Sequence, residues 1–256
     1  MQIKFLGTGA ADWDWSQPLE GERRGSCSTL LDGHILLDAG ATALANLARS
    51  NVAPGEITDI VLTHSHSDHF NVEAVRVIAG VPARREKLRF YGSAEACSAV
   101  GGDAVCTAIT RGDKFTVGDL KFTALPANHL LENFAEETFN YLIETVDGKR
   151  LYYALDGAWI NTLARHLLGN KPLDMIVWDA TTGTTWNDWR FAEHNDLKMI
   201  GYMADAMRKI GLITDKTVQI FDHIARTLWP STAEERAATA AEYGGILAYD
   251  TMTWDL

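Results

Sequence analysis

The sequence predicts an α+β fold in which two mixed β-sheets are flanked by helices, arranged as an αββα sandwich. Segments with strand and helix patterns alternate along all 256 residues. Hairpins are indicated in each half by Asp32-Gly33 and Asp147-Gly148, because glycine tolerates the positive φ of a tight turn. Hairpins favour mixed sheets over a doubly wound parallel sheet. No linker rich in Pro, Gly or Ser divides the chain, so we expect a single domain over residues 1–256.

The predicted strands are short, mostly apolar runs bounded by turn residues. They lie at residues 3–6, 28–31, 34–37, 59–63, 88–91, 140–145, 150–154, 175–178, 218–221 and 246–254, with a two-strand segment at 114–125 that is broken at Gly118-Asp119. The predicted helices carry apolar residues at helical spacing, as Val72, Val75 and Ile78 do. They lie at residues 41–49, 71–79, 93–100, 158–168, 195–209 and 232–243.

The composition is that of a globular protein with an acidic surface. Hydrophobic residues make up 46% of the chain, which is enough for a sizeable core, and the formal net charge is −11. Affinity for nucleic acids and anionic lipids depends on Lys and Arg. We therefore expect neither a nucleic acid nor a membrane as a partner, whereas a small phosphate compound remains compatible with this charge.

Cysteine usage and the amino-terminal sequence bear on the cellular compartment. Cys27, Cys97 and Cys106 are odd in number and form no CxxC pair, so neither a disulfide framework nor a thiolate zinc site is indicated. No signal-peptide hydrophobic region follows Met1, and no apolar run approaches the ~20 residues that span a bilayer. These features predict a cytoplasmic protein.

The strongest chemical signal is the run H-S-H-S-D-H at residues 64–69, directly after a predicted strand. In an extended segment, side chains two residues apart point the same way, so His64 and His66 can reach one cation. Asp68 and His69, at the turn into the next helix, face a neighbouring point. Imidazole and carboxylate groups are good ligands for zinc, manganese or iron. The run therefore indicates a metal pair.

Further candidate ligands follow other predicted strands. His129, Asp156 and His223 each come at the end of an apolar strand, where loops gather into functional sites.

Taken in this order, HxHxDH and the later His, Asp and His residues resemble the metallo-β-lactamase superfamily. The segments F-L-G-T-G at residues 5–9, L-L-D-A-G at 36–40 and A-Y-D at 248–250 support the resemblance, which covers essentially the whole chain. It implies the metallo-β-lactamase fold and a metal-dependent hydrolase.

The resemblance also implies a ligand set for two divalent metals, zinc or manganese, with iron as a further candidate. The first metal would be held by His64, His66 and His129, and the second by Asp68, His69 and His223, with Asp156 bridging. Metals about 3.5–4 Å apart would share a hydroxide that acts as the nucleophile and would stabilise the charge that develops. Asp68 would also orient the hydroxide.

Departures from the family pattern point to one branch. Di-iron oxidoreductases of the superfamily tend to carry Glu where this chain has Ser67. The Gly-Thr-Gly start and the Leu-Asp-Ala-Gly element resemble the phosphodiesterase branch, which includes cyclic phosphodiesterases of phosphonate breakdown and tRNA 3′-processing nucleases. Residues 10–25 contain no cysteine, so the structural zinc site that some phosphonate-pathway members carry there is absent.

His194 is a second candidate catalytic residue beside Asp68. Phosphodiesterases of this branch resemble the chain in placing a histidine here, where it can act as general acid at the leaving oxygen. Alternatively, His194 only precedes Asn195 and Asp196, which are typical of a helix start. Two Trp-bearing loops, at residues 12–15 and 186–189, can stack on a base or sugar or simply be pinned by half-buried indoles. Asp179 faces the same edge without an assigned role, and the substrate-binding residues are unknown.

The leading hypothesis is a phosphodiesterase that cleaves a small cyclic or nucleotide-like phosphodiester. The alternatives are lactone or thioester hydrolysis at the same metals, tRNA 3′-processing, and a metal-bound sensor without catalysis. A tRNA nuclease would be expected to carry a basic arm, which this acidic chain does not show. The fold is compatible with a homodimer.

Overall fold

The computed structural model describes residues 1–82 and 85–256. The chain forms two compact units. Unit 1 consists of Met1–Thr110, Leu131–Glu137 and Tyr249–Asp255, and unit 2 consists of Arg111–Leu130, Thr138–Ala248 and Leu256. Each unit contains a seven-stranded sheet. The prediction of a single domain over residues 1–256 stays a prediction.

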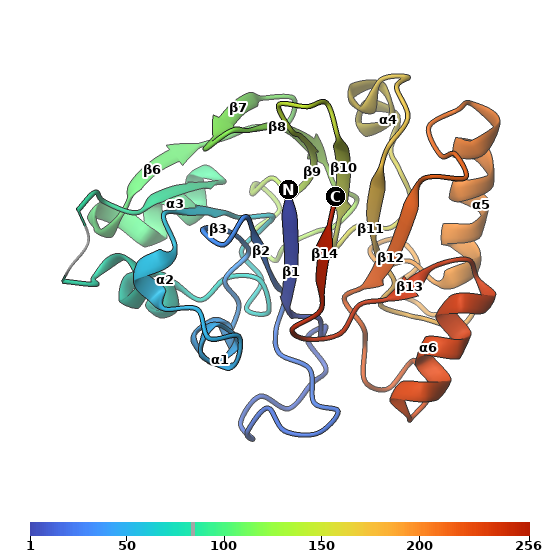
Figure 1. Ribbon diagram of the computed structural model, residues 1–256, viewed down its shortest axis with the longest axis horizontal. Helices are drawn as coiled ribbons and strands as arrows, with labels where there is room; N and C mark the ends of the chain where they lie inside the picture. Colours follow the sequence, from blue (N-terminus) through green and yellow to red (C-terminus); the bar gives the residue numbers. More distant parts are fainter. Residues whose placement is uncertain (83–84) are drawn as a thin grey trace. The chain divides into compact units, whose positions relative to one another are not determined.

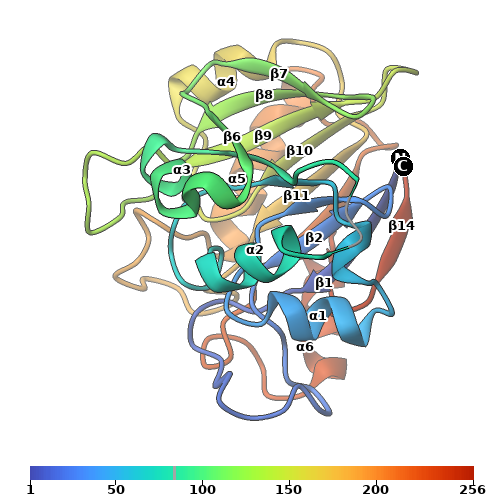
Figure 2. The ribbon, with the colours of Figure 1, turned by 90° about the vertical axis from the view of Figure 1, so that its left-hand side faces the viewer.

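The sheet of unit 1 has the order β14-β1-β2-β3-β4-β5-β6. Its strands are β1 (Gln2–Gly7), β2 (Ser28–Leu31), β3 (Ile35–Leu37), β4 (Asp59–Val61), β5 (Arg89–Gly92), β6 (Val105–Ala108) and β14 (Thr253–Asp255). Pairing is antiparallel from β14 to β3 and parallel from β3 to β6. Helices α1 (Ala43–Arg49), α2 (Val72–Ala79) and α3 (Ala94–Val100) share a hydrophobic core with these strands, and Figure 2 shows α1 and α2 in front of them.

The sheet of unit 2 has the order β13-β12-β11-β10-β9-β8-β7. Its strands are β7 (Lys114–Val117), β8 (Leu120–Pro126), β9 (Phe139–Glu144), β10 (Arg150–Ala154), β11 (Met175–Asp179), β12 (Val218–Asp222) and β13 (Ile246–Leu247). Pairing is antiparallel from β7 to β10 and parallel from β10 to β13. Helices α4 (Thr162–Leu168), α5 (Leu197–Lys209) and α6 (Ala233–Glu242) pack on this sheet through a core that includes Trp178 and Phe221. Figure 1 shows α5 and α6 beside β12 and β13.

The two sheets are therefore mixed and carry helices, and this part of the fold-class prediction is confirmed. Two short 3-10 turns, Pro54–Glu56 and Gly101–Asp103, complete the assigned elements of the described residues. Among residues 1–82 and 85–256, no helix has the length and apolar character required to cross a membrane.

Two secondary-structure predictions were wrong, and one strand was missed. The helix predicted over residues 158–168 begins only at Thr162, because the side chain of Asn161 caps it by accepting the Ala164 N–H. The strand predicted over 246–254 is two short strands, β13 and β14, that pair with different sheets. Strand β6 was not predicted, because it is a largely exposed strand without apolar alternation.

A carboxylate near the carboxyl terminus joins distant parts of unit 1. Asp250 Oδ1 accepts hydrogen bonds from the N–H and the hydroxyl of Thr8, at 2.9 and 2.6 Å. Its Oδ2 accepts the Gly25 N–H at 2.6 Å and also pairs with the guanidinium of Arg49. This carboxylate therefore ties the end of β1, the loop before β2 and helix α1 to the carboxyl-terminal segment.

Replacing Asp250 should destabilise the protein. Asp250→Ala leaves the Thr8 and Gly25 donors without their acceptor, so we expect a loss of about 2–3 kcal/mol in the free energy of unfolding. Urea unfolding measures it. Asp255→Ala, at an exposed position of β14, is the control and should change stability by less than about 0.5 kcal/mol. Equal effects of the two substitutions would show that the Asp250 network does not stabilise the fold.

Candidate metal centre

In unit 1, the histidine run leaves β4 and is held by backbone contacts to the loop after β3. The Ala39 N–H donates to the His69 carbonyl at 2.7 Å, and the Ala41 N–H donates to the Ser67 carbonyl at 3.0 Å. Gly40 lies between these two contacts, and a Cβ there would come within 1.9 Å of the Asp68 carbonyl oxygen. The Asp-Ala-Gly element after β3 is thus shaped to carry the histidine run.

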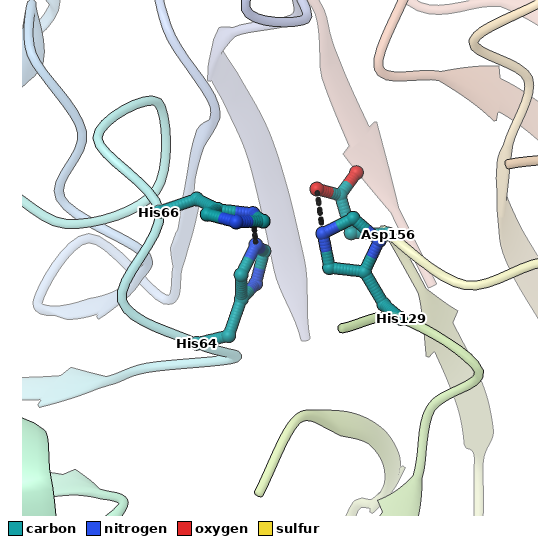
Figure 3. A group of neighbouring side chains, drawn as sticks. All are labelled: His64, His66, His129 and Asp156. Carbon is teal, nitrogen blue, oxygen red and sulfur yellow. Dashed lines mark hydrogen bonds and ion pairs between the residues drawn. The ribbon is translucent and has the colours of Figure 1, made fainter. Parts of the chain in front are cut away.

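His64 and His66 lie together in this loop (Figure 3). Nε2 of His64 is 3.1 Å from Nδ1 of His66. Two histidine nitrogens on one tetrahedral zinc, each about 2.0–2.1 Å from the metal, are about 3.3 Å apart. The observed separation is compatible with two ligands of one metal ion, and the assignment of both histidines to one ion stays a prediction.

Asp38 and Thr63 orient two histidines of unit 1 through contacts to their Nδ1 atoms. Asp38 is fully buried, and its Oδ1 accepts the N–H of Thr63 at 2.7 Å and the Thr63 hydroxyl at 3.0 Å. Nδ1 of His69 donates to Asp38 Oδ2 at 2.8 Å, and Nδ1 of His64 lies 2.9 Å from the Thr63 hydroxyl. With Nδ1 engaged in this way, each imidazole presents Nε2 to a metal; Nε2 of His69 is 3.7 Å from the carboxylate of Asp68.

Glu136 is a further contact of the histidine run that the sequence did not single out. Its buried carboxylate accepts hydroxyl hydrogen bonds from Ser65 at 2.7 Å and from Ser93 at 2.8 Å. Ser65 lies between His64 and His66, so Glu136 holds the backbone that carries both candidate ligands. No local pattern marks this glutamate, because its partners are distant in the sequence.

In unit 2, Asp156 follows β10 and faces two histidines. Its Oδ2 lies 3.5 Å from Nε2 of His129 (Figure 3), and its Oδ1 lies 2.9 Å from Nδ1 of His223. All three side chains are at most 2% exposed. A carboxylate whose two oxygens face different histidines has the geometry of a bridging ligand.

Asp179, to which the sequence assigned no role, pairs with His194. Nδ1 of His194 donates to Asp179 Oδ2 at 2.9 Å. The Thr181 hydroxyl donates to Asp179 Oδ1 at 2.6 Å and lies 2.7 Å from Nδ1 of His223. Asp179 is therefore the residue that orients His194 and, through Thr181, His223.

The electrostatics of this pair favour the charged forms. Burial opposes the imidazolium of His194, but the carboxylates of Asp179 and Asp156 outweigh it and raise the pKa of His194. Burial would likewise raise the pKa of Asp179, yet the neighbouring imidazole of His194 outweighs it and the pKa of Asp179 is lowered. A raised imidazole pKa suits a general acid, because the group keeps its proton near neutral pH.

The donor set of unit 2 fits a divalent metal. Ligand atoms of Asp156, Asp179, His194 and His223 all lie within 4.8 Å of one another. Nitrogen and carboxylate oxygen donors are those that zinc and manganese accept. His194 therefore lies among the candidate ligands of unit 2. The start of α5 is capped by Asp196, which accepts the Met199 N–H.

The Trp-bearing loops differ in their surroundings. Trp13 is buried, and Nε1 of Trp15 donates to the Arg24 carbonyl at 3.2 Å. Trp186 packs between Lys198 and Tyr243. Trp189 alone among these indoles is strongly exposed. The interpretation of pinned loops therefore fits Trp13, Trp15 and Trp186 but not Trp189.

The chain belongs to the β-lactamase superfamily, because residues 34–224 match the family described as the beta-lactamase superfamily domain. A protein of Methanococcus maripaludis named ribonuclease Z is 34% identical over 97 residues, which are 37% of this chain and 30% of that protein. The chain thus spans less than a third of the length of this curated relative.

Solved structures agree on the fold. The metallo-β-lactamase fold protein YhfI from Bacillus subtilis superimposes with a TM-score of 0.74 at 14% identity, over 99% of each chain. A diphosphatase of the PhnP family gives 0.72 at 18% identity, over 100% of this chain and 97% of the other. The predicted metallo-β-lactamase fold is confirmed.

Removing Asp156 should lower the metal content. After equilibration with zinc or manganese and desalting, we expect about two metal ions per chain in the wild type and about one or fewer in Asp156→Ala, because one carboxylate serves both ions in a bridged pair. Elemental analysis of the protein measures this. Asp205→Ala, at an exposed position of α5, should retain the wild-type content. Full metal content in Asp156→Ala would rule out its role as a ligand.

Proposed function

We propose that this chain is a dinuclear metal-dependent phosphodiesterase that cleaves a small cyclic or nucleotide-like phosphodiester. The observation that carries the proposal is the carboxylate of Asp156, whose two oxygens face His129 and His223. In the proposal, His64, His66 and His129 hold one ion, Asp68, His69 and His223 hold the other, and Asp156 bridges. Zinc and manganese are the expected metals. When bound, such a pair supplies a water of lowered pKa and polarises the phosphoryl oxygen.

The chain's own residues divide the remaining tasks. Asp68 orients the attacking water by accepting a hydrogen bond from it. His194 holds a proton for the leaving oxygen, and Asp179 keeps that imidazole oriented and charged through the bond at Nδ1. An acid placed at the leaving group supplies the proton that an alkoxide needs on departure.

The net charge of −11 favours a small substrate over a long polyanion. The ribonuclease Z relative favours an RNA phosphodiester as the second candidate. The two differ in salt dependence, since binding of a polyanion weakens steeply with salt whereas binding of a small diester does not.

Hydrolysis of bis(p-nitrophenyl) phosphate with added zinc or manganese tests the phosphodiesterase. We expect activity in the wild type and in Asp205→Ala and none above background in Asp156→Ala. For a cyclic nucleotide, whose sugar alkoxide is a poor leaving group, His194→Ala should lower kcat by about 10²–10⁴-fold. The loss should be smaller for the aryl ester, because p-nitrophenolate departs without a proton. A metal-loaded wild type inert towards both esters would refute the proposal and favour lactones and thioesters.

The pH dependence tests the pairing of Asp179 with His194. Because Asp179 is bonded to Nδ1 of His194 and stabilises its imidazolium form, kcat for the cyclic nucleotide should fall as the pH rises and His194 loses its proton. Asp179→Asn removes one negative charge from the imidazolium, so the alkaline limb should move to lower pH. The pH profile of kcat measures this, with Asp205→Asn as the control. An alkaline limb that stays in place would exclude this role of Asp179.

A further inference from the structure

Trp159 of unit 2 combines a strained backbone conformation with a partly exposed indole. Its backbone is left-handed, with φ of 59°, a conformation that is a rare outlier for a bulky residue. The residue is nevertheless 42% exposed, so its indole keeps part of its surface open to solvent. Costly backbone conformations persist where the surroundings impose them, and they cluster at functional sites.

Residues next to the candidate site impose this conformation. The N–H of Trp159 donates to Oδ1 of Asn195 at 2.8 Å, and Nδ2 of the buried Asn195 donates to the Gly157 carbonyl at 2.9 Å. On the other side, Nδ2 of Asn128 donates to the Ala158 carbonyl at 2.9 Å.

These anchors are chain neighbours of the site residues. Asn195 follows His194, Asn128 precedes His129, and Trp159 itself comes three residues after Asp156. The position of the Trp159 backbone is therefore set by the same segments that place three candidate site residues.

A second segment beside the site also presents aromatic side chains to solvent. Trp189 is 78% and Phe191 is 61% exposed. They lie on the turn that leads into His194, where the N–H groups of Glu193 and His194 donate to the Arg190 carbonyl at 2.8 and 2.9 Å. Exposed aromatic surface thus occurs in both segments that flank the Asp179–His194 pair in unit 2.

We propose that Trp159 binds the substrate by stacking on a planar ring carried by one ester group of the phosphodiester, so that the substrate is a nucleotide-like ester and not a simple sugar phosphate. The inference rests on the proposed function and specifies its substrate class. An indole offers a large, stiff face to any base, and stacking of this kind needs no base-specific hydrogen bond. The exposed indole and its imposed backbone are then explained by one requirement, a ring-binding face at a set position beside the site.

The test compares two product-like ligands that share the sugar and the phosphate but differ in the ring. Calorimetry of the metal-loaded protein gives the Kd of adenosine monophosphate and of ribose phosphate. We expect adenosine monophosphate to bind about tenfold more tightly. Trp159→Ala should abolish this preference by weakening adenosine monophosphate alone, and Trp159→Phe should restore most of it. Tyr202→Ala, an exposed aromatic residue on α5, is the matched control and should keep it.

A wild type that binds both ligands equally or binds neither would overturn the inference, and so would a Trp159→Ala variant that folds, by its Tm, and keeps the preference. Hydrolysis of bis(p-nitrophenyl) phosphate in the same preparations separates the two proposals. Hydrolysis without a ring preference would refute only the proposed role of Trp159. A ring preference without hydrolysis would refute the proposed phosphodiesterase activity and would leave a site that binds planar rings.

Discussion

The candidate site depends on one interaction that occurs in each unit, a buried aspartate that accepts a hydrogen bond from a threonine hydroxyl. In unit 1, Asp38 binds Thr63, whose hydroxyl lies 2.9 Å from Nδ1 of His64 and 3.3 Å from Nδ1 of His69. In unit 2, Asp179 binds Thr181, whose hydroxyl lies 2.7 Å from Nδ1 of His223 and 3.2 Å from that of His194. Each threonine hydroxyl thus contacts Nδ1 of two imidazoles, and these contacts fix the orientation of the rings.

Three residues of the candidate site adopt a strained backbone conformation just after a strand. Asp38, Asp156 and His223 each follow a strand closely, and each has a positive φ, between 47° and 59°. Such a residue turns the chain sharply as the strand ends and costs about 1–3 kcal/mol. The parallel pairing of β10, β11 and β12 brings the ends of these strands to one edge of the sheet. The side chains at or just after these ends, Asp156, Asp179 and His223, therefore gather without a long loop.

The sequence predicted the site residues that stand in a local pattern. It missed the roles that depend on contacts between residues distant in the sequence. The run at residues 64–69 shows its chemistry directly, and His129, Asp156 and His223 could be found because each follows an apolar strand. Glu136 carries no such signal, because its importance comes from Ser65, 71 residues away. Asp179 also ends an apolar strand, but no local pattern showed its role, because that role comes from His194, 15 residues away. The segment at 158–161 has a helical pattern, yet it is held in another conformation, because Asn128 donates to the Ala158 carbonyl and Asn195 accepts the Trp159 N–H.

The position of Asp179 also bears on how a histidine can remain an acid next to metal ions. His194 lies 3.8 Å from Asp156, so a cation bound by that carboxylate would repel the imidazolium and lower the pKa of His194. Asp156 would then be neutralised by the metal and could no longer support the proton. Asp179, bonded directly to Nδ1, is placed to supply the opposite charge. The bond to the fully buried carboxylate of Asp179 therefore allows His194 to keep its proton and to serve as the acid rather than as a further ligand.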